Sequence, residues 1–352
     1  MIEPFASRPS PKIVFGPGTL RELPACVREL GASAVFIVTD RGIAGAGHLD
    51  TAKTLLESSG IPVATYDRAR ENPTEADAAA CCAVARPLQF DCIVALGGGS
   101  SMDTAKACNF LLTNGGAMRD YHGYGKATKP LLPFIAIPTT AGTGSECQSY
   151  ALVSKDDSHE KMACGDPKAR ARIAILDPEL TATQPKSVAI LTGMDALAHA
   201  LESLVCTRRN AVSSLYGEGA FRHLSCALSA VIAGRANQDD RGHMQLGAAM
   251  SGLAIENSML GAAHATANPL TARHNLVHGH AVALMLPHVM RFNAADPAVS
   301  RIYDRLSAIL KEENVSSNPV VDWVTDLVSK CALPSVNGTP IDLAALAQDA
   351  AK

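Results

Sequence analysis

The first half of the chain alternates short, continuous apolar runs with longer stretches of helical periodicity. Continuous apolar character, rather than a strict alternation of apolar and polar positions, suits strands that are buried on both faces of a sheet. We therefore predict a mainly parallel sheet that is flanked by helices. The predicted strands are AVFIVTD (34–40), IPVATYD (61–67), DCIVALGGG (91–99), PFIAIPTT (133–140) and ARIAILD (171–177).

Helical periodicity is clearest in NPTEADAAACCAVARPL (72–88), where Thr74 is the expected N-cap and acidic residues fill the first turn. From about Pro185 onward the pattern is helical and contains no convincing strand. Two long examples are PKSVAILTGMDALAHALESLVC (185–206) and MQLGAAMSGLAIENSMLGAAHATA (244–267).

This change of pattern predicts two domains, which agrees with the length of 352 residues. Residues 1–183 are expected to form an α/β domain and residues 184–352 an all-helical domain. Because no Gly/Ser linker separates the two halves, we expect them to pack tightly and to leave a cleft between them.

The composition is that of a globular chain, with 47% hydrophobic and 18% charged residues. The formal net charge is -3 and no long Lys/Arg run occurs, so neither a nucleic acid nor a membrane surface is an expected partner. The N-terminus lacks the pattern of a signal peptide, and no apolar run reaches the roughly 20 residues that span a bilayer. The 10 cysteines are scattered without C-x-x-C spacing, as in a reducing compartment. We expect a cytoplasmic protein.

Two glycine-containing loops are candidates for binding a phosphate group. Gly97-Gly98-Gly99-Ser100-Ser101 follows a predicted strand and precedes a helix, where backbone N–H groups can bind an anion. Its spacing is not G-x-G-x-x-G, so a plain tight turn remains an alternative. Pro138-Thr139-Thr140-Ala141-Gly142-Thr143-Gly144-Ser145 follows another predicted strand. Two such loops at the carboxyl ends of parallel strands favour a nucleotide site.

A carboxylate at the end of a third strand fits the same site. Asp40 ends the run FIVTD, where it can accept hydrogen bonds from ribose hydroxyls and repel a 2′-phosphate. This favours NAD over NADP, although Asp40 could equally be a helix cap.

In the helical half, Asp195 and His199 are four residues apart in MDALAHALE, which places both side chains on one face of a helix. Such a pair is often a surface or capping pair. Here the flanking residues are nearly all apolar, so the face is expected to be buried. A cation is one remedy for the cost of burying these polar groups.

Four motifs in order along the chain resemble the iron-containing (group III) alcohol dehydrogenases. They are GGGSSMDTAKA, PTTAGTGSE, MDALAHALE and HATANPLTARHNLVHGHAVALMLPHVMRFN. The resemblance covers nearly the whole chain and implies a dehydroquinate synthase-like architecture, with an α/β dinucleotide-binding domain followed by an all-α metal-binding domain. It also implies reversible hydride transfer between nicotinamide and a small alcohol or aldehyde, whose oxygen binds a divalent metal.

The resemblance assigns site residues by motif. Its metal ligands fall on Asp195, His199, His264 and His278. Its NAD contacts fall on Asp40, Asn72, Gly98, Gly99, Ser100, Asp103, Thr139, Thr140, Thr143 and Lys161. Fe(II) is the metal that the family implies, although Zn(II) binds such a donor set more tightly and nickel or manganese could also occupy it.

The remaining histidines of the cluster between residues 262 and 281 receive other interpretations. His274 lies near His278 and either lines the pocket or sits at the surface, while His280 is expected to be structural. His288 belongs to the family motif but not to its ligand set. By the same resemblance, Tyr150, Ile255, Met259 and Asn268 border the substrate, which gives a mostly aliphatic wall suited to small or medium alcohols and aldehydes.

Asn268 departs from the family pattern, because many members carry a histidine there that is discussed as part of a proton path. Asparagine cannot exchange a proton near neutral pH. We therefore expect protons to travel by a ribose hydroxyl, bound water or another group such as His274.

Three alternatives remain open at this stage. EPFASRPSPKIVFG is similar to the start of maleylacetate reductases, which share the fold but differ around the glycine loop. A lyase of the dehydroquinate synthase type would need a basic substrate pocket, for which the helical half lacks Lys/Arg clustering. A non-catalytic nucleotide- or metal-binding protein is the third. For the leading hypothesis we expect a homodimer or higher homo-oligomer.

Overall fold

The computed structural model describes residues 4–157, 160–274, 276–334 and 342–351. The chain divides into two compact units, an α/β unit of residues 9–140 and 145–184 and a helical unit of residues 1–8, 141–144 and 185–352. The chain therefore leaves the α/β unit at residue 141, contributes residues 141–144 to the helical unit, and returns to the α/β unit at residue 145.

Six parallel strands form the main sheet of the α/β unit, in the order β1-β9-β6-β4-β2-β3. The predicted apolar runs are confirmed as five of these strands, while β1 was not among the predicted runs. The strands are β1 (Lys12–Phe15), β2 (Val35–Val38), β3 (Val63–Tyr66), β4 (Cys92–Gly97), β6 (Phe134–Pro138) and β9 (Ile173–Leu176).

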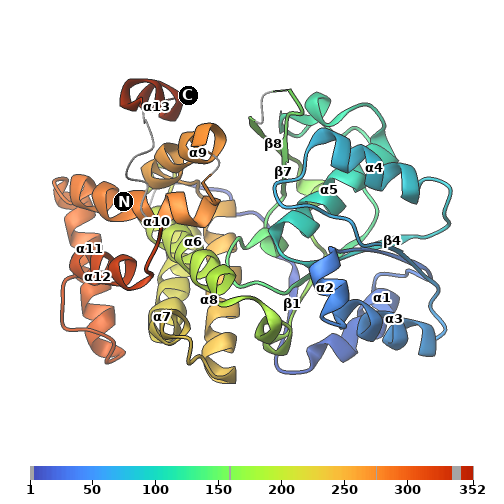
Figure 1. Cartoon of the computed structure of the whole chain (residues 1–352), viewed down its shortest axis with the longest axis horizontal. Coiled ribbons are helices and arrows are strands. Elements are labelled where there is room, and N and C mark those ends of the chain that lie inside the picture. Colours follow the sequence, from blue (N-terminus) through green and yellow to red (C-terminus); the bar gives the residue numbers. More distant parts are fainter. Residues whose placement is uncertain (1–3, 158–159, 275, 335–341, 352) are drawn as a thin grey trace. The chain divides into compact units, whose positions relative to one another are not determined.

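Both faces of this sheet are covered by helices (Figure 1). Phe36, Ile93 and Phe134 pack toward one face, together with α4 and α5, while Ile37, Val94 and Ile135 pack toward the other. Burial on both faces explains the continuous apolar character of the four central strands β2, β4, β6 and β9, which are buried at every position. The helices of this unit are α1 (Leu23–Glu29), α2 (Arg41–Gly45), α3 (His48–Ser58), α4 (Glu75–Ala85) and α5 (Gly99–Asn114).

The predicted cap of α4 is confirmed. The Thr74 hydroxyl accepts a hydrogen bond from the backbone N–H of Asp77, and the Asp77 carboxylate accepts one from the backbone N–H of Thr74. This capping box supplies partners at a helix end that would otherwise leave backbone donors unpaired.

A second, three-stranded sheet has the order β5-β8-β7, with β7 and β8 antiparallel. None of its strands was predicted from the sequence. They are β5 (Gly123–Tyr124), β7 (Tyr150–Ser154) and β8 (Lys161–Gly165).

The order of the main sheet identifies a topological switch point. β3 lies on one side of β2 and β4 lies on the other, so the connections from β2 and β3 turn in opposite directions. Open α/β sheets bind ligands at such a point, outside the carboxyl ends of the strands. Asp40 follows β2 and the triple-glycine turn follows β4, so both lie at this point.

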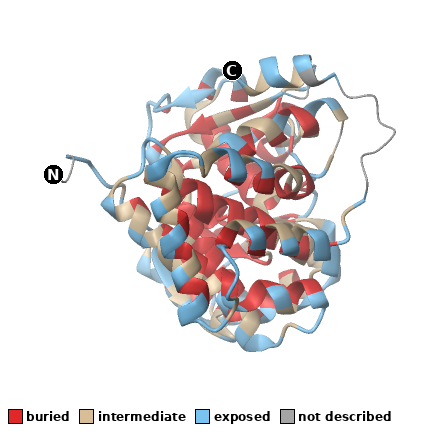
Figure 2. Ribbon diagram, turned by 90° about the vertical axis from the view of Figure 1, so that its left-hand side faces the viewer, coloured by how far each residue is buried: buried red, intermediate tan, exposed pale blue. Residues whose placement is uncertain are grey.

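The part of the helical unit that the structure describes contains helices and no strand, as predicted. Its core is apolar and mostly aliphatic. Figure 2 shows the buried residues along the helices of this unit. The helices are α6 (Lys186–Val205), α7 (Ala211–Ala233), α8 (Gln238–Glu256), α9 (Ala262–His274), α10 (His278–Asn293), α11 (Pro297–Glu312), α12 (Val320–Lys330) and α13 (Leu343–Ala350).

Among the described helices, α6 is long and apolar enough to cross a membrane by length and composition, but 72% of its apolar window is buried inside the structure. It packs against α7, α8 and α10 and carries buried polar groups at Asp195, His199 and Glu202. These are properties of a core helix.

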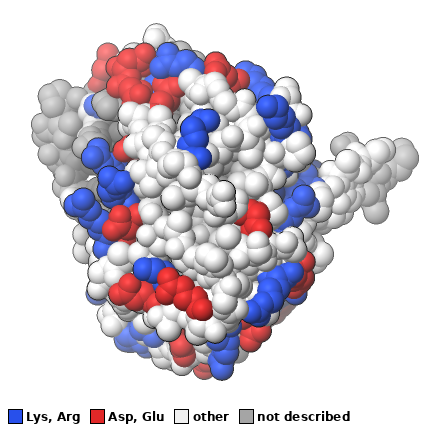
Figure 3. All heavy atoms as spheres, turned by 90° about the vertical axis from the view of Figure 1, so that its right-hand side faces the viewer, with Lys and Arg blue, Asp and Glu red and all other residues white. Residues whose placement is uncertain are grey.

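Charged side chains are mixed on the face drawn in Figure 3, where Lys and Arg alternate with Asp and Glu around an uncharged area. This agrees with the small formal net charge of -3.

Candidate functional site

The centre of the candidate site is a buried carboxylate on α6. Asp195 and His199 are 4% and 5% exposed. The four-residue spacing places them on one face of the helix, with His199 Nε2 3.7 Å from Asp195 Oδ1. The sequence-based prediction that this face is buried is confirmed.

Two further imidazoles approach the same carboxylate oxygen. His264 Nε2, from α9, lies 3.2 Å from Asp195 Oδ1, and His278 Nε2, from the first residue of α10, lies 3.5 Å from it. The potential ligand atoms of Asp195, His199 and His264 all lie within 4.8 Å of one another. The His199 and His264 rings stack with their centroids 4.7 Å apart.

The donor set fits a divalent cation. Three imidazole Nε2 atoms lie within 3.2–3.7 Å of one carboxylate oxygen, and this combination of oxygen and nitrogen ligands binds Fe(II), Zn(II) and similar ions. Three of the four side chains are buried, where an uncompensated carboxylate would be costly.

Electrostatics within the cluster follow from burial and short distances. Burial alone would raise the pKa of Asp195, but His199 and the other imidazoles hold that pKa well below its usual range. Burial likewise opposes protonation of His264, yet Glu202 and Asp195 outweigh it and raise the pKa of His264 to about 10. Burial lowers the pKa of His199. Asp195 is therefore ionised and available as a ligand near neutral pH.

Glu202 is a member of this cluster that the sequence-based reasoning missed. Its carboxylate is 3% exposed and hydrogen-bonds to His264 Nδ1. Asp195, His199 and Glu202 lie on one stripe of α6, at positions i, i+4 and i+7. A third polar residue on an otherwise apolar helix face was the signal that could have revealed it.

At the switch point of the α/β unit, the triple-glycine turn lies beside Asp40. Gly97 has φ +155, and a Cβ there would lie 2.5 Å from Ser101 Oγ and 3.3 Å from Asp40 Oδ2. Ser101 Oγ also donates to Asp40 Oδ2 at 3.1 Å. Asp40 caps α2 as well, because its other oxygen accepts from the Ile43 N–H. Asp40 is therefore a helix cap, which was the alternative interpretation of this residue. Its second carboxylate oxygen nevertheless lies beside the triple-glycine turn.

Three more predicted cofactor residues gather at the same turn. The Asn72 N–H donates to Ser100 Oγ at 3.3 Å, with Asn72 itself at φ 50. The Thr139 N–H donates to the Gly97 carbonyl oxygen, and Thr140 Oγ1 lies 3.4 Å from the place of a Cβ on Gly98. The Thr139 hydroxyl is buried and has no hydrogen-bond partner within the described part of the chain. A buried, unpartnered hydroxyl beside a glycine turn is consistent with a ligand site.

The other predicted cofactor residues lie in different surroundings. Asp103 is buried on α5 and accepts a hydrogen bond from Ser145 Oγ at 3.5 Å, and burial raises its pKa to about 6 against the opposing charge of Lys106. Lys161 begins β8. Thr143 lies in the segment 141–144, which belongs to the helical unit.

The residues predicted to border the substrate are distributed over both units. Tyr150 begins β7 in the α/β unit, and its ring lies 5.7 Å from the Tyr124 ring. Ile255 is buried on α8, whereas Met259 is 42% exposed after that helix. Asn268 is exposed on α9.

The remaining histidines differ in exposure. His274 is half-buried at the end of α9, and His288 is exposed on α10. His280 is buried, and burial lowers its pKa. None of these three belongs to the cluster around Asp195.

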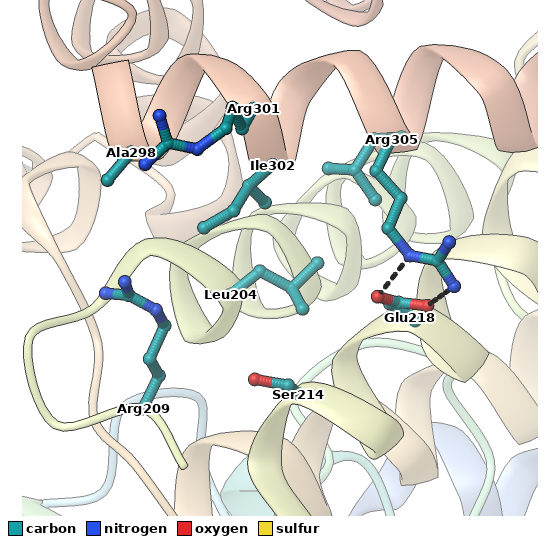
Figure 4. A pocket seen from close by; sticks show the side chains of 9 residues that line it. Leu204, Arg209, Ser214, Glu218, Ala298, Arg301, Ile302 and Arg305 are labelled. Atoms are coloured by element: carbon teal, nitrogen blue, oxygen red, sulfur yellow. Dashed lines mark hydrogen bonds and ion pairs between the residues drawn. The ribbon is translucent and has the colours of Figure 1, made fainter. Parts of the chain in front are cut away.

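A separate hollow of about 370 Å³ lies among α6, α7 and α11 (Figure 4). Its lining includes Arg209, Ser214 and Arg301, and Arg305 pairs with Glu218 through two hydrogen bonds of 2.7 Å. No predicted site residue lines this hollow, so we do not associate it with the candidate metal site around Asp195.

Comparison with known proteins decides the family. The family model "Iron-containing alcohol dehydrogenase" matches residues 10–178, and "Fe-containing alcohol dehydrogenase family, C-terminal" matches residues 189–350. Alcohol dehydrogenase 4 of Schizosaccharomyces pombe is 34% identical over 315 residues, which are 90% of this chain and 75% of that protein. The chain belongs to the iron-containing alcohol dehydrogenase family.

Two other proteins illustrate the range of this family. The NAD-dependent methanol dehydrogenase of Bacillus methanolicus is 33% identical over 283 residues, covering 80% of this chain and 74% of that protein. The solved structure of an alcohol dehydrogenase from Oenococcus oeni superposes with a TM-score of 0.89 at 26% identity, covering 99% of this chain and 94% of that one.

These comparisons confirm the predicted family, fold class and enzyme class. The chain is an oxidoreductase of the iron-containing alcohol dehydrogenase family, with a parallel-sheet N-terminal part and a helical C-terminal part. A nicotinamide cofactor and a divalent metal, with a small alcohol as substrate, agree with the family and with the metal-binding geometry around Asp195. The relatives named above are all alcohol oxidoreductases, and they give no support to a lyase.

Proposed function

We propose that this dehydrogenase interconverts small alcohols and aldehydes with NAD(H), and that Asp195, His199, His264 and His278 hold its metal. The observation that carries this proposal is the convergence of three imidazole Nε2 atoms within 3.2–3.7 Å of one carboxylate oxygen. The metal would act as a Lewis acid toward the substrate oxygen. Fe(II) is the proposed ion because of the family, while the same donor set also accommodates Zn(II).

The two halves of the chain have different proposed roles. We propose residues 1–183 as the NAD-binding domain and residues 184–352 as the metal-binding domain. The turn Gly98-Gly99-Ser100 offers the N-terminus of α5 to the cofactor diphosphate, where unpaired N–H groups favour negative charge. Asn72, Asp103, Thr139, Thr140, Thr143 and Lys161 complete the proposed NAD contacts.

Asp40 is the proposed determinant of NAD over NADP, because a carboxylate at the end of β2 repels a 2′-phosphate. Asp40→Asn tests this cleanly, since asparagine keeps an oxygen for the Ile43 N–H and so keeps the cap of α2. We expect weaker NAD⁺ binding and a smaller preference over NADP⁺ in calorimetric titrations. An unchanged ratio of the two affinities would assign Asp40 to the helix cap alone.

The proposed substrate wall consists of Tyr150, Ile255, Met259, Asn268 and His274, which suits aliphatic alcohols of small or medium size. Because Asn268 cannot relay a proton, we propose that the proton leaves by a ribose hydroxyl, bound water or His274. We further propose a cytoplasmic enzyme that forms a homodimer or higher homo-oligomer.

Metal reconstitution tests the central proposal. The wild type is loaded anaerobically with Fe(II) or Zn(II), its metal content is measured, and NADH absorbance is followed with a panel of alcohols and aldehydes. His278→Ala should lose both metal and turnover. His288→Ala is the matched control, because His288 lies exposed on the same helix, α10. Full metal content in His278→Ala would refute the ligand assignment, and absence of turnover with every metal and substrate would favour a non-catalytic protein.

A further inference from the structure

Glu202 makes three contacts with a single stretch of chain at the start of α9. Its Oε1 accepts hydrogen bonds from the backbone N–H groups of Ala263, at 2.6 Å, and His264, at 3.3 Å. Its Oε2 lies 2.5 Å from His264 Nδ1. The same side chain, from α6, thus supplies an acceptor to the first turn of α9 and to the imidazole that this turn carries.

The approach of the two helices is close at this point. Gly261 precedes α9, and a Cβ there would lie 2.9 Å from Glu202 Oε1 and 3.2 Å from its carboxyl carbon. Glu202 is 3% exposed and His264 is 2% exposed, so water does not compete for these hydrogen bonds. All three donors are satisfied by the one carboxylate in this arrangement.

This arrangement determines which nitrogen of His264 is available for a metal. An ionised carboxylate only accepts hydrogen bonds, so the nitrogen that faces Glu202 must carry a proton. Nδ1 keeps that proton, and a metal, which needs an unprotonated imidazole nitrogen, displaces the proton of the other one. In His264 this is Nε2, the atom that lies 3.2 Å from Asp195 Oδ1.

We infer that Glu202 is a positioning residue of the metal site, which holds the proton of His264 on Nδ1 and directs Nε2 toward Asp195. The inference rests on the proposed role of His264 as a ligand. The hydrogen bonds described for Glu202 go to α9 and to His264 Nδ1, on the side of the ring away from Asp195. It acts through His264, whose ring it orients and whose electron density it increases.

Glu202→Gln separates the two roles of the side chain. The glutamine oxygen replaces Oε1 as the acceptor for the two backbone N–H groups, which keeps the start of α9 satisfied. Its NH₂ group then replaces Oε2 and faces His264 Nδ1 as a donor. The imidazole must accept there and carry its proton on Nε2, which blocks the nitrogen that would bind the metal.

The test compares Zn(II) affinity by chelator competition in the full-length wild type, Glu202→Gln and Glu256→Gln. Glu256 is the matched control, because it is a buried carboxylate of the helical unit that pairs with Arg8 and lies outside the cluster. We expect Glu202→Gln to bind Zn(II) roughly 10–100-fold more weakly, as is typical when the partner of a metal-binding histidine is removed. Glu256→Gln should stay within about twofold of the wild type, since it leaves the His264 partner intact.

Thermal unfolding in the presence of a chelator distinguishes positioning from a merely structural role. Glu202→Gln should melt close to the wild type without metal, because the cap of α9 is kept, while its Zn(II) affinity falls. Equal Zn(II) affinity in Glu202→Gln and the wild type would overturn the inference, as would an equal loss in Glu256→Gln. A wild type that binds no metal would instead contradict the proposed function.

A measurement on the wild type alone covers the case in which Glu202→Gln does not fold. Nitrogen-15 correlation spectra of the histidine rings in the Zn(II)-loaded protein identify which nitrogen carries the proton. We expect a protonated, hydrogen-bonded Nδ1 on His264 and no proton on Nε2. The opposite tautomer would overturn the inference.

Discussion

Replacing Glu146 by glutamine tests how a buried carboxyl group makes stability depend on pH. Glu146 follows the loop after β6 and is 2% exposed. Burial raises its pKa from 4.5 to about 7, although the charge of Lys106 acts in the opposite direction. The folded protein therefore keeps this proton at pH values at which the unfolded chain has already released it.

The sign of the effect follows from proton binding. Between the two pKa values the folded state binds more protons than the unfolded state, so the free energy of unfolding falls as the pH rises. The contribution of Glu146 changes little below about pH 4.5, falls as the pH rises toward 7, and levels off above that. A difference of one unit in pKa is worth about 1.4 kcal/mol, so the rise in the pKa of Glu146 corresponds to about 3 kcal/mol of unfolding free energy in total. Of this, roughly 2 kcal/mol is lost between about pH 5 and pH 7.

The assay is urea unfolding followed by circular dichroism at pH 5 and at pH 7. Because glutamine does not titrate, Glu146→Gln lacks this loss of stability. Its free energy of unfolding, relative to that of the wild type, should therefore be about 2 kcal/mol higher at pH 7 than at pH 5. Glu57→Gln is the control, since Glu57 is exposed on α3 of the same unit. A difference between Glu146→Gln and the wild type that is the same at both pH values would refute the reasoning.

Three further predictions concern packing, a buried ammonium and the proton path. Gly252→Ala would place a Cβ 2.4 Å from the Gly144 carbonyl oxygen, so it should destabilise the helical unit by about 1–3 kcal/mol in urea unfolding; an unchanged midpoint would contradict this. Lys106 Nζ lies 2.7–3.0 Å from four oxygens of residues 145–150, which share its three N–H donors. Lys106→Met should therefore cost about 3 kcal/mol or more by the same measurement, and a loss below about 1 kcal/mol would show that these bonds are replaced. Asn268→Ala should keep much of the hydride-transfer rate in single-turnover measurements of NADH, and a loss as complete as that of a ligand variant would reject our view of the proton path.

Local sequence patterns determined much of the α/β unit. The strands β2, β3, β4, β6 and β9 lie within the predicted apolar runs. All of them except the edge strand β3 are buried at every position, and burial on both faces of a parallel sheet requires apolar residues at successive positions. The cap of α4 at Thr74 was predictable for a similar reason, since its partners lie within four residues.

The second sheet was not predictable in this way. β5 consists of Gly123 and Tyr124 alone, and its partner β8 begins at Lys161. β1 has no buried residue and exists as a strand through its pairing with β9, which lies at the other end of the unit's sequence. Short strands of this kind are selected by their neighbours rather than by their own residues.

The candidate metal site shows the same division between local pattern and tertiary structure. The sequence by itself determined that Asp195 and His199 share a helix face, because four residues make about one helical turn. The approach of His264 Nε2 to Asp195, 69 residues away in the sequence, depends on how α9 packs against α6. The role of Glu202 depends on that packing entirely, since a carboxylate on a helix acquires a defined partner only when the fold brings a donor within hydrogen-bond distance and excludes water from around it.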